Sequence, residues 1–187
     1  GPWAFQPTIP YPTFGFGAAF KWWPDKEKET GPYLAGSIND MNGDPNLEGF
    51  NWSTVERGEF FYGLEVGHNW QRSKDDFDHV HLLLFYADER STRSPDTLPN
   101  KAGGGFQVLV EKQWDSLVGF SGFTYNTAEG GGVAGTLSEV TLTVGAAYKN
   151  PFNVQGETAI SLLYMNPIEE IFDAPVRDQY GLEMYWR

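Results

Sequence analysis

Hydrophobic and polar residues alternate strictly along Glu59–Trp70. One row of alternate positions is apolar and runs from Phe60 to Trp70, whereas the other row holds Glu59 and Glu65 among small and polar residues. A period of two predicts a β-strand with two different faces. Aromatic residues at both ends of the apolar row are typical of a strand that crosses a bilayer within a barrel. A half-buried strand of a soluble β-sandwich would show the same alternation.

The pattern recurs along the chain, and the sequence predicts about nine strands and no helix. The strands are expected at Thr13–Trp23, Tyr33–Asn39, Glu59–Trp70, His79–Tyr86, Gly104–Trp114, Leu117–Asn126, Ser138–Lys149, Thr158–Asn166 and Tyr180–Arg187. The faces of the fourth strand stay unassigned, because residues 82–86 are apolar throughout. Residues 1–12 carry four prolines and are expected to form a lead-in to a single domain, residues 13–187.

The lengths of the connections carry further information. Short connections are expected at 24–31, 71–78, 115–116 and 150–157, and long ones at 41–58, 87–102, 127–137 and 167–179. Because short and long connections alternate, an up-and-down meander places all four long loops at one end of the sheet. Outer-membrane barrels have this asymmetry, whereas Greek-key sandwiches have no reason for it. We therefore predict an all-β fold, an antiparallel up-and-down transmembrane β-barrel.

The odd number of strands predicts that this barrel is partial. A closed antiparallel meander of nine strands would bring its first and last strands together in parallel. An open edge inside a membrane leaves N–H and C=O groups unpaired, at several kcal/mol each. We expect Thr13–Trp23 and Tyr180–Arg187 not to pair with each other, and the remainder of the barrel to come from further sequence or another chain. A pore of porin width requires roughly 16–18 strands.

Composition narrows the possible partners. The net charge of −12 over 187 residues speaks against nucleic acid and anionic lipid headgroups. Mean hydropathy is −0.43, and no apolar run approaches the ~18 residues that a membrane helix needs. A β-barrel remains compatible with this value, because alternation dilutes hydropathy. The absence of cysteine excludes disulfides and thiolate metal sites.

The alternation assigns residues to an outward and an inward row. The outward row is apolar and is expected to face lipid: Phe60, Tyr62, Leu64, Val66, Val108, Val110, Val140, Leu142, Val144, Ile160, Leu162 and Leu182. The inward row has few bulky side chains and suits a water-filled lumen. Its candidate pore-lining and substrate-binding residues are Arg57, Glu59, Glu65, Asn69, Gln107, Glu111, Gln113, Glu183, Tyr185 and Arg187.

Two groups within this set have a more specific expectation. Planar hydrogen-bonding groups beside an aromatic ring bind sugars, and Glu183, Tyr185 and Arg187 offer that combination at strand spacing. The alternative is that these side chains only keep the lumen wet. Arg57 lies where a long loop enters the barrel, and Arg90 and Arg93 lie on the next long loop. These three arginines are candidates for a constriction, with solvated loop charges as the alternative.

Four stretches carry a family resemblance. They are Tyr11-Pro12 followed by Gly15 and Gly17, Asn-Asp-Met-Asn-Gly-Asp-Pro at 39–45, Val-Gly-Ala-Ala-Tyr-Lys-Asn-Pro-Phe at 144–152, and Asp-Gln-Tyr-Gly-Leu-Glu-Met-Tyr-Trp at 178–186. In this order and spacing, the chain from about Tyr11 to Arg187 resembles the later part of a carbohydrate-selective porin of the OprB type.

The resemblance implies a function and a location. It implies an outer-membrane porin of a Gram-negative-type bacterium that passes sugars and other small hydrophilic solutes by passive diffusion, with no enzymatic activity and no cofactor. It also implies a constriction in which arginines are prominent. Arginines are sparse in the inward rows predicted here.

Metal binding is not predicted. His79 and His81 share one face of a strand and could ligate zinc, but the sequence places no third ligand, so a non-ligand role is favoured. Residues 40–45 resemble part of a calcium loop. The glycine there is out of step with the EF-hand pattern and a proline follows, so a turn is favoured.

Two other classes of function remain open. One is an outer-membrane hydrolase with its acidic, histidine and hydroxyl groups at the barrel mouth, namely Ser53, Glu56, His79 and His81. No Gly-x-Ser-x-Gly signature supports it. The other is a soluble glycan-binding β-sandwich that uses exposed indole rings, namely Trp3, Trp22, Trp23 and Trp52. A sandwich would need no detergent to stay in solution.

Overall fold

Nine β-strands and one short helix make up the described part of the chain. The computed structural model describes residues 16–24, 30–40, 53–73, 76–89, 101–128, 138–151, 154–168 and 177–186. In chain order, its elements are β1 (Gly17–Trp22), β2 (Gly31–Asp40), α1 (Ser53–Arg57), β3 (Phe60–Ser73), β4 (Asp76–Ala87), β5 (Gly103–Trp114), β6 (Leu117–Asn126), β7 (Ser138–Lys149), β8 (Glu157–Pro167) and β9 (Gln179–Trp186).

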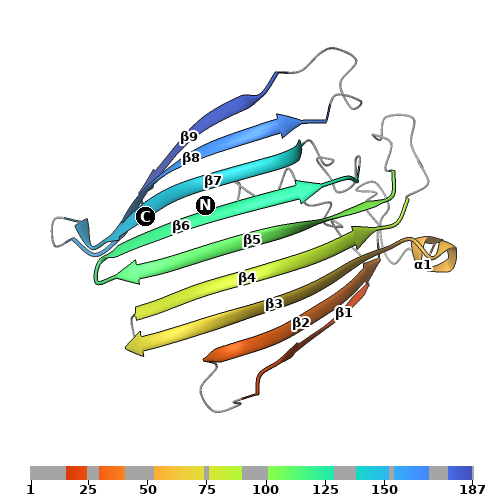
Figure 1. The fold of residues 1–187 in the computed structure, drawn as a ribbon, viewed down its shortest axis with the longest axis horizontal. Helices are drawn as coiled ribbons and strands as arrows, with labels where there is room; N and C mark the ends of the chain where they lie inside the picture. The colour runs from red at the N-terminus through yellow and green to blue at the C-terminus, as the bar shows by residue number, and fades with distance from the viewer. Residues whose placement is uncertain are drawn as a thin grey trace.

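The strands form one antiparallel sheet in which sequence order and spatial order are the same (Figure 1). The predicted all-β meander is therefore confirmed. The expectation of no helix is wrong at α1, which has five residues. A helix of that length is too short for a 3.6-residue periodicity to be visible in the sequence. Within the described residues, no helix has the length and apolar character to cross a membrane.

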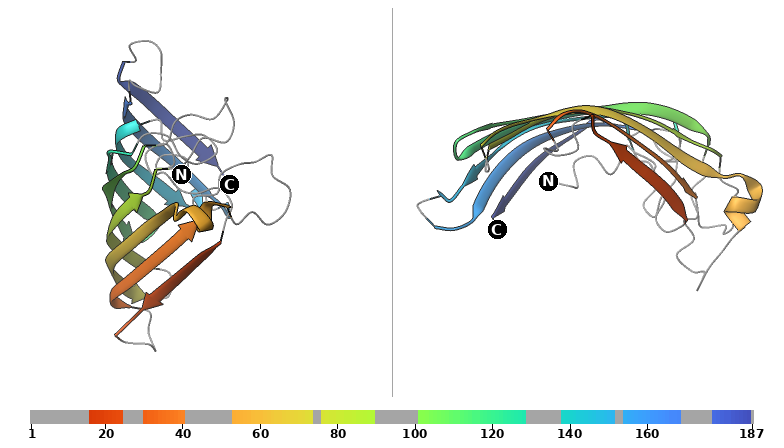
Figure 2. Two further views of the ribbon diagram at one scale, coloured as in Figure 1. Left: turned by 90° about the vertical axis from the view of Figure 1, so that its right-hand side faces the viewer. Right: turned by 90° about the horizontal axis from the view of Figure 1, so that it is seen from below.

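The sheet is curved into an arch and stays open (Figure 2). Among the described residues, β1 pairs with β2 and β9 pairs with β8, and the two edge strands do not pair with each other. The expectation that the first and last strands remain unpaired is confirmed for this part of the chain. Each edge presents a row of backbone groups that need a partner in an apolar environment.

Connections of different length gather at opposite ends of the sheet. The short-turn end carries the connections from β1 to β2, β3 to β4, β5 to β6 and β7 to β8, and the long-connection end carries the other four. The predicted asymmetry is thus confirmed for the strands that these connections join. The long loops themselves, including residues 42–43 and 130–132, lie outside the described residues.

The apolar outward row lies on the convex face. All twelve predicted outward residues are partly or largely exposed, with Leu162 at 63%, Leu182 at 62% and Leu142 at 40%. The strand pairings hold this row in register: Leu142 lies opposite Tyr164, and Val144 opposite Leu162. Paired residues share a face, so one local alternation extends across the whole sheet.

The concave face is more crowded and more polar. Gln107, Thr124, Thr141, Thr143 and Ser161 are all buried there, because curvature brings neighbouring side chains together. Two apolar clusters interrupt this polar surface. Phe61, Leu83, Phe85 and Ala87 pack near the long-connection end, whereas Val118, Ala147, Ala159 and Tyr185 pack near the short-turn end. The unassigned fourth strand thus points His79, His81, Leu83 and Phe85 to the concave side.

Candidate functional site: the concave face

Seven predicted pore-lining residues lie in three rows that cross the sheet, each made of residues that pair across neighbouring strands. Asn69, Glu111 and Glu183 share one row, which runs from β3 through His79, Phe120, Gly145 and Ser161 to β9. Glu65 and Gln107 share a second row, and Gln113 and Tyr185 a third. The sequence therefore predicted correctly that these side chains share one face of the sheet.

The predicted arginines do not lie in these rows of the sheet. Arg57 belongs to α1 rather than to a strand, and its side chain is 46% exposed. Its Nη1 lies 3.8 Å from Oε1 of the buried Glu59, just before β3. Arg90, Arg93 and Arg187 lie outside the described residues. The structure therefore brings no constriction together within its described part.

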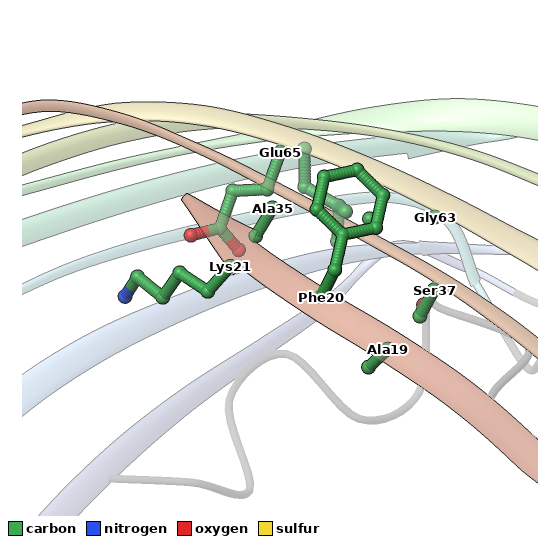
Figure 3. Close-up of a pocket in the computed structure, with 9 residues that line it drawn as sticks. Ala19, Phe20, Lys21, Ala35, Ser37, Gly63 and Glu65 are labelled. Atoms are coloured by element: carbon green, nitrogen blue, oxygen red, sulfur yellow. The ribbon is translucent and has the colours of Figure 1, made fainter. Parts of the chain in front are cut away.

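A cluster of polar side chains occupies the concave face over β1–β4. The Tyr33 hydroxyl donates a hydrogen bond to Glu65 Oε1 and lies 2.9 Å from Nε2 of His79. The Lys21 ammonium stands 4.1 Å from the centre of the Tyr33 ring and 4.6 Å from that of Trp23. Lys21 and Glu65 line a hollow of about 500 Å³. Figure 3 shows both side chains beneath the arch of the sheet. Lys21 and Tyr33 were not predicted, because their role depends on the strands beside them.

Gly67 makes the Tyr33 contacts possible. It lies directly opposite Tyr33 in the β2–β3 pairing. A Cβ atom at Gly67 would overlap the Tyr33 ring. The missing side chain lets that ring lie across β3 and reach both Glu65 and His79.

A second polar network lies at the short-turn end. Lys112 Nζ is 3.0 Å from Asp78 Oδ2, and the Gln113 backbone N–H donates to Asp78 Oδ1 at 2.9 Å. The Gln113 side chain accepts from Lys149 Nζ at 2.9 Å and donates to the Asp115 carbonyl at 2.9 Å. The Gln113 amide thus joins β5 to β7 and to a turn, which makes its role structural.

The predicted sugar-binding group is placed only in part. Glu183 Oε2 accepts from Ser161 Oγ at 3.4 Å, and the Tyr185 hydroxyl donates to Glu157. The Tyr185 ring packs on the apolar cluster near the short-turn end and is partly buried by it. Arg187 lies outside the described residues. The Glu183 carboxylate and the Tyr185 ring are therefore both held by contacts with neighbouring residues on the concave face.

The residues of the two alternative functions do not come together. Ser53 and Glu56 belong to α1 at the long-connection end, whereas His79 and His81 lie well before Ala87, where β4 reaches that end. The separation along the strand is about 20 Å or more, too far for one catalytic site. For the glycan-binding alternative, Trp22 is exposed on the convex face, whereas Trp23 packs against Tyr33 at 4.9 Å. Trp3 and Trp52 lie outside the described residues.

Comparison with family models, with curated proteins and with solved structures finds no match to this chain.

Proposed function

We propose that this chain forms part of the wall of a water-filled channel in a bacterial outer membrane. The channel passes small hydrophilic solutes by passive diffusion, and the resemblance to carbohydrate-selective porins makes sugars the first candidates. The observation that carries the proposal is on the convex face. Exposed aliphatic side chains form a band there over β2–β5 and β7–β9, β1 and β6 continue it with small and aromatic residues, and aromatic rings border the band at both ends of the sheet.

The two aromatic borders follow the strand ends. At the short-turn end the border consists of Trp22, Trp70, Trp114, Tyr148 and Trp186, and at the long-connection end of Tyr62, Tyr86, Phe106, Tyr125, Tyr164 and Tyr180. Rings on adjacent strands lie close together, with centroids 6.4 Å apart for Tyr62 and Tyr86 and 5.5 Å apart for Tyr164 and Tyr180. Aromatic girdles at both interfaces are a feature of membrane barrels.

The positions of charged residues and the height of the apolar band both support contact of the convex face with lipid. On the outward rows of the described strands, charged residues occur only within two residues of a strand end, as at Asp40, Asp78 and Lys112. On β3, Tyr62 and Trp70 are eight residues apart, which is about 26 Å along the strand. A strand tilt of about 40° reduces this to about 20 Å, close to the ~25 Å apolar band of outer-membrane barrels.

A soluble sandwich is the less suitable explanation. Its inner face would be apolar, because two sheets bury their facing side chains against each other. The concave face here carries Gln107, Gln113, Thr141 and Thr143, and a face with this many polar side chains suits a polar lumen better than a second apolar sheet. The edges of β1 and β9, which pair with no other described strand, then mark where further strands, from this or another chain, complete the wall.

Channel measurements test this proposal directly. We expect the complete channel, in which further strands pair with β1 and β9, to give stepwise ion conductance when it is solubilised in detergent and reconstituted in planar bilayers with EDTA present. Proteoliposomes should swell in isotonic solutions of monosaccharides and not in those of large oligosaccharides. The matched control is the same chain inactivated by heating. Folded protein that partitions into bilayers but neither conducts nor admits sugars would contradict the proposal.

Neighbouring residues on β9 offer a second test of sidedness. The chain has no cysteine, so a single introduced thiol reports on one position only. Met184 is 70% exposed on the convex face, whereas Glu183 lies on the concave face. In proteoliposomes, we expect a membrane-impermeant thiol reagent to modify Glu183→Cys about tenfold faster than Met184→Cys. A thiol at position 184 would be surrounded by lipid, where it stays protonated and the reagent cannot reach it. The reverse order would support a soluble sheet.

A further inference from the structure

We propose that Glu65, His79 and His81 form a binding site for a divalent transition-metal ion, best matched by zinc, on the concave face of the sheet. One carboxylate oxygen of Glu65 and one ring nitrogen of each histidine lie within 4.8 Å of one another. The proposal goes beyond the channel function and does not depend on it. Sequence periodicity paired the two histidines, and the register of β3 with β4 supplies the third ligand.

The pairing of the strands explains why the three groups meet. Glu65 lies opposite Leu83, which is two residues from His81 on the same face of β4. Glu65 and His81 are therefore diagonal neighbours, within reach of long side chains. His79 and His81 are next to each other on this face, with ring centroids 5.0 Å apart. Ligand atoms around a tetrahedral zinc lie about 3.3 Å apart, which side-chain rotations in this cluster can reach.

The hydrogen bonds around the rings present suitable lone pairs. The Tyr33 hydroxyl donates its single hydrogen to Glu65, so Nε2 of His79 must donate in its 2.9 Å contact with the Tyr33 oxygen. Nε2 of His81 lies 3.4 Å from the Gln107 amide oxygen, which only accepts. In a neutral His81 ring that donates through Nε2, the lone pair is on Nδ1.

His81 provides an observation independent of the cluster. Its Nδ1 is buried and has no hydrogen-bond partner within the described part of the chain. A buried polar atom without a partner costs free energy, so its retention needs an explanation. A bound metal ion supplies one. The bonds from Nε2 to Gln107 and Tyr33 then correspond to the outer-shell contacts that orient histidine ligands in metal sites.

The ligand set indicates the kind of ion. Two imidazoles and one carboxylate are typical of zinc sites that keep a fourth position for water or another small ligand. Magnesium and calcium prefer sites made of oxygen ligands alone. The Lys21 ammonium lies over the Tyr33 and Trp23 rings, next to the cluster, and its charge makes an anionic ligand suitable for that fourth position.

Zinc titration of the folded full chain tests the site. We expect the detergent-solubilised protein to bind one zinc ion, measured by calorimetry with Zn²⁺ as the probe and by competition with a chromophoric chelator. Glu65→Gln and His81→Ala should each weaken binding at least tenfold, because losing even an outer-shell partner costs about 10–100-fold. Glu65→Gln keeps the shape of the side chain, and circular dichroism checks that both variants fold.

The third histidine of the chain provides the matched control. His68 lies on the outward row of β3, with its ring 4.1 Å from that of Trp70. His68→Ala should leave zinc affinity unchanged. The proposal is overturned if folded wild-type protein binds no zinc, if both ligand variants bind as tightly as wild type, or if His68→Ala weakens binding equally. Conductance measured in EDTA tests the channel alone, so failure of either proposal can be told from failure of the other.

Discussion

The convex and concave faces of this sheet are built from the same strands but show opposite relations between polarity and burial. Leu162 on the convex face is 63% exposed, whereas its neighbour Ser161 on the concave face is 5% exposed. Leu142 and Thr143 differ in the same way, with 40% and 0%. In a protein that folds in water, large exposed apolar surfaces usually mark contact with another apolar phase. The proposed lipid environment accounts for this inversion.

The concave face is crowded by geometry rather than by hydrophobicity. Inward side chains converge because the sheet is curved, so polar groups there need hydrogen-bond partners. Gln107 Nε2 donates to Thr124 Oγ1 at 3.2 Å, and Asn126 exchanges two bonds with the Ala128 backbone at 2.7 and 2.9 Å. The convex face has no such requirement. In this protein, the exposed fraction of a side chain therefore depends on the curvature of the sheet. Whether a side chain is apolar or polar indicates whether it faces lipid or the lumen.

The largest expected effect is that of a charge in the middle of the convex face. Leu142→Arg should lower the free energy of unfolding in lipid bilayers by about 2–4 kcal/mol, because the guanidinium would lie near the midplane. Val154→Arg is the control, since Val154 is 54% exposed in the turn between β7 and β8, outside the apolar band. Denaturant titration of both variants measures the difference. Equal losses would argue against lipid contact at Leu142.

A smaller effect is expected from filling space on the concave face. Gly67→Ala should cost about 1–3 kcal/mol, because the new methyl group would overlap the Tyr33 ring and displace its bond to Glu65. Gly181→Ala is the matched control on β9, where a Cβ atom would meet Leu163 at an ordinary 3.4 Å. Chemical denaturation compares the two variants. The packing described at Tyr33 would be wrong if both changes had the same cost.

The smallest effect concerns the edge of the apolar band. The Lys112–Asp78 pair at the short-turn end has its lysine side chain 47% exposed, so the coupling free energy between the two residues should be about 1 kcal/mol or less. A double-mutant cycle with Lys112→Met and Asp78→Asn measures it. Added salt should reduce the coupling further. A coupling well above this value would place the pair deeper in the apolar region than the aromatic border indicates.

Most of the fold could be predicted because strand alternation is local. The bounds of β6 and β7 agree with the sequence prediction at both ends. β3 ends three residues later and β4 begins three residues earlier than predicted, because the charged segment at 71–78 resembles a turn. β2 is longer than predicted, and α1 was not predicted at all. Each difference lies where a short or charged segment has no clear period.

The same distinction between local and tertiary information applies to the candidate site. The sequence alone shows which side chains of one strand share a face, because the alternation of side chains is a property of a single extended strand. It therefore placed Glu65, Gln107 and Glu183 in inward rows, and His79 and His81 on one face of a strand whose orientation stayed unassigned. Which of these side chains touch was decided by the tertiary structure, because contact depends on the register between strands and on the curvature of the sheet. Tyr33 meets Glu65 and His79 only because Gly67 lies opposite it, and a glycine on one strand carries no local sign of the ring on the next.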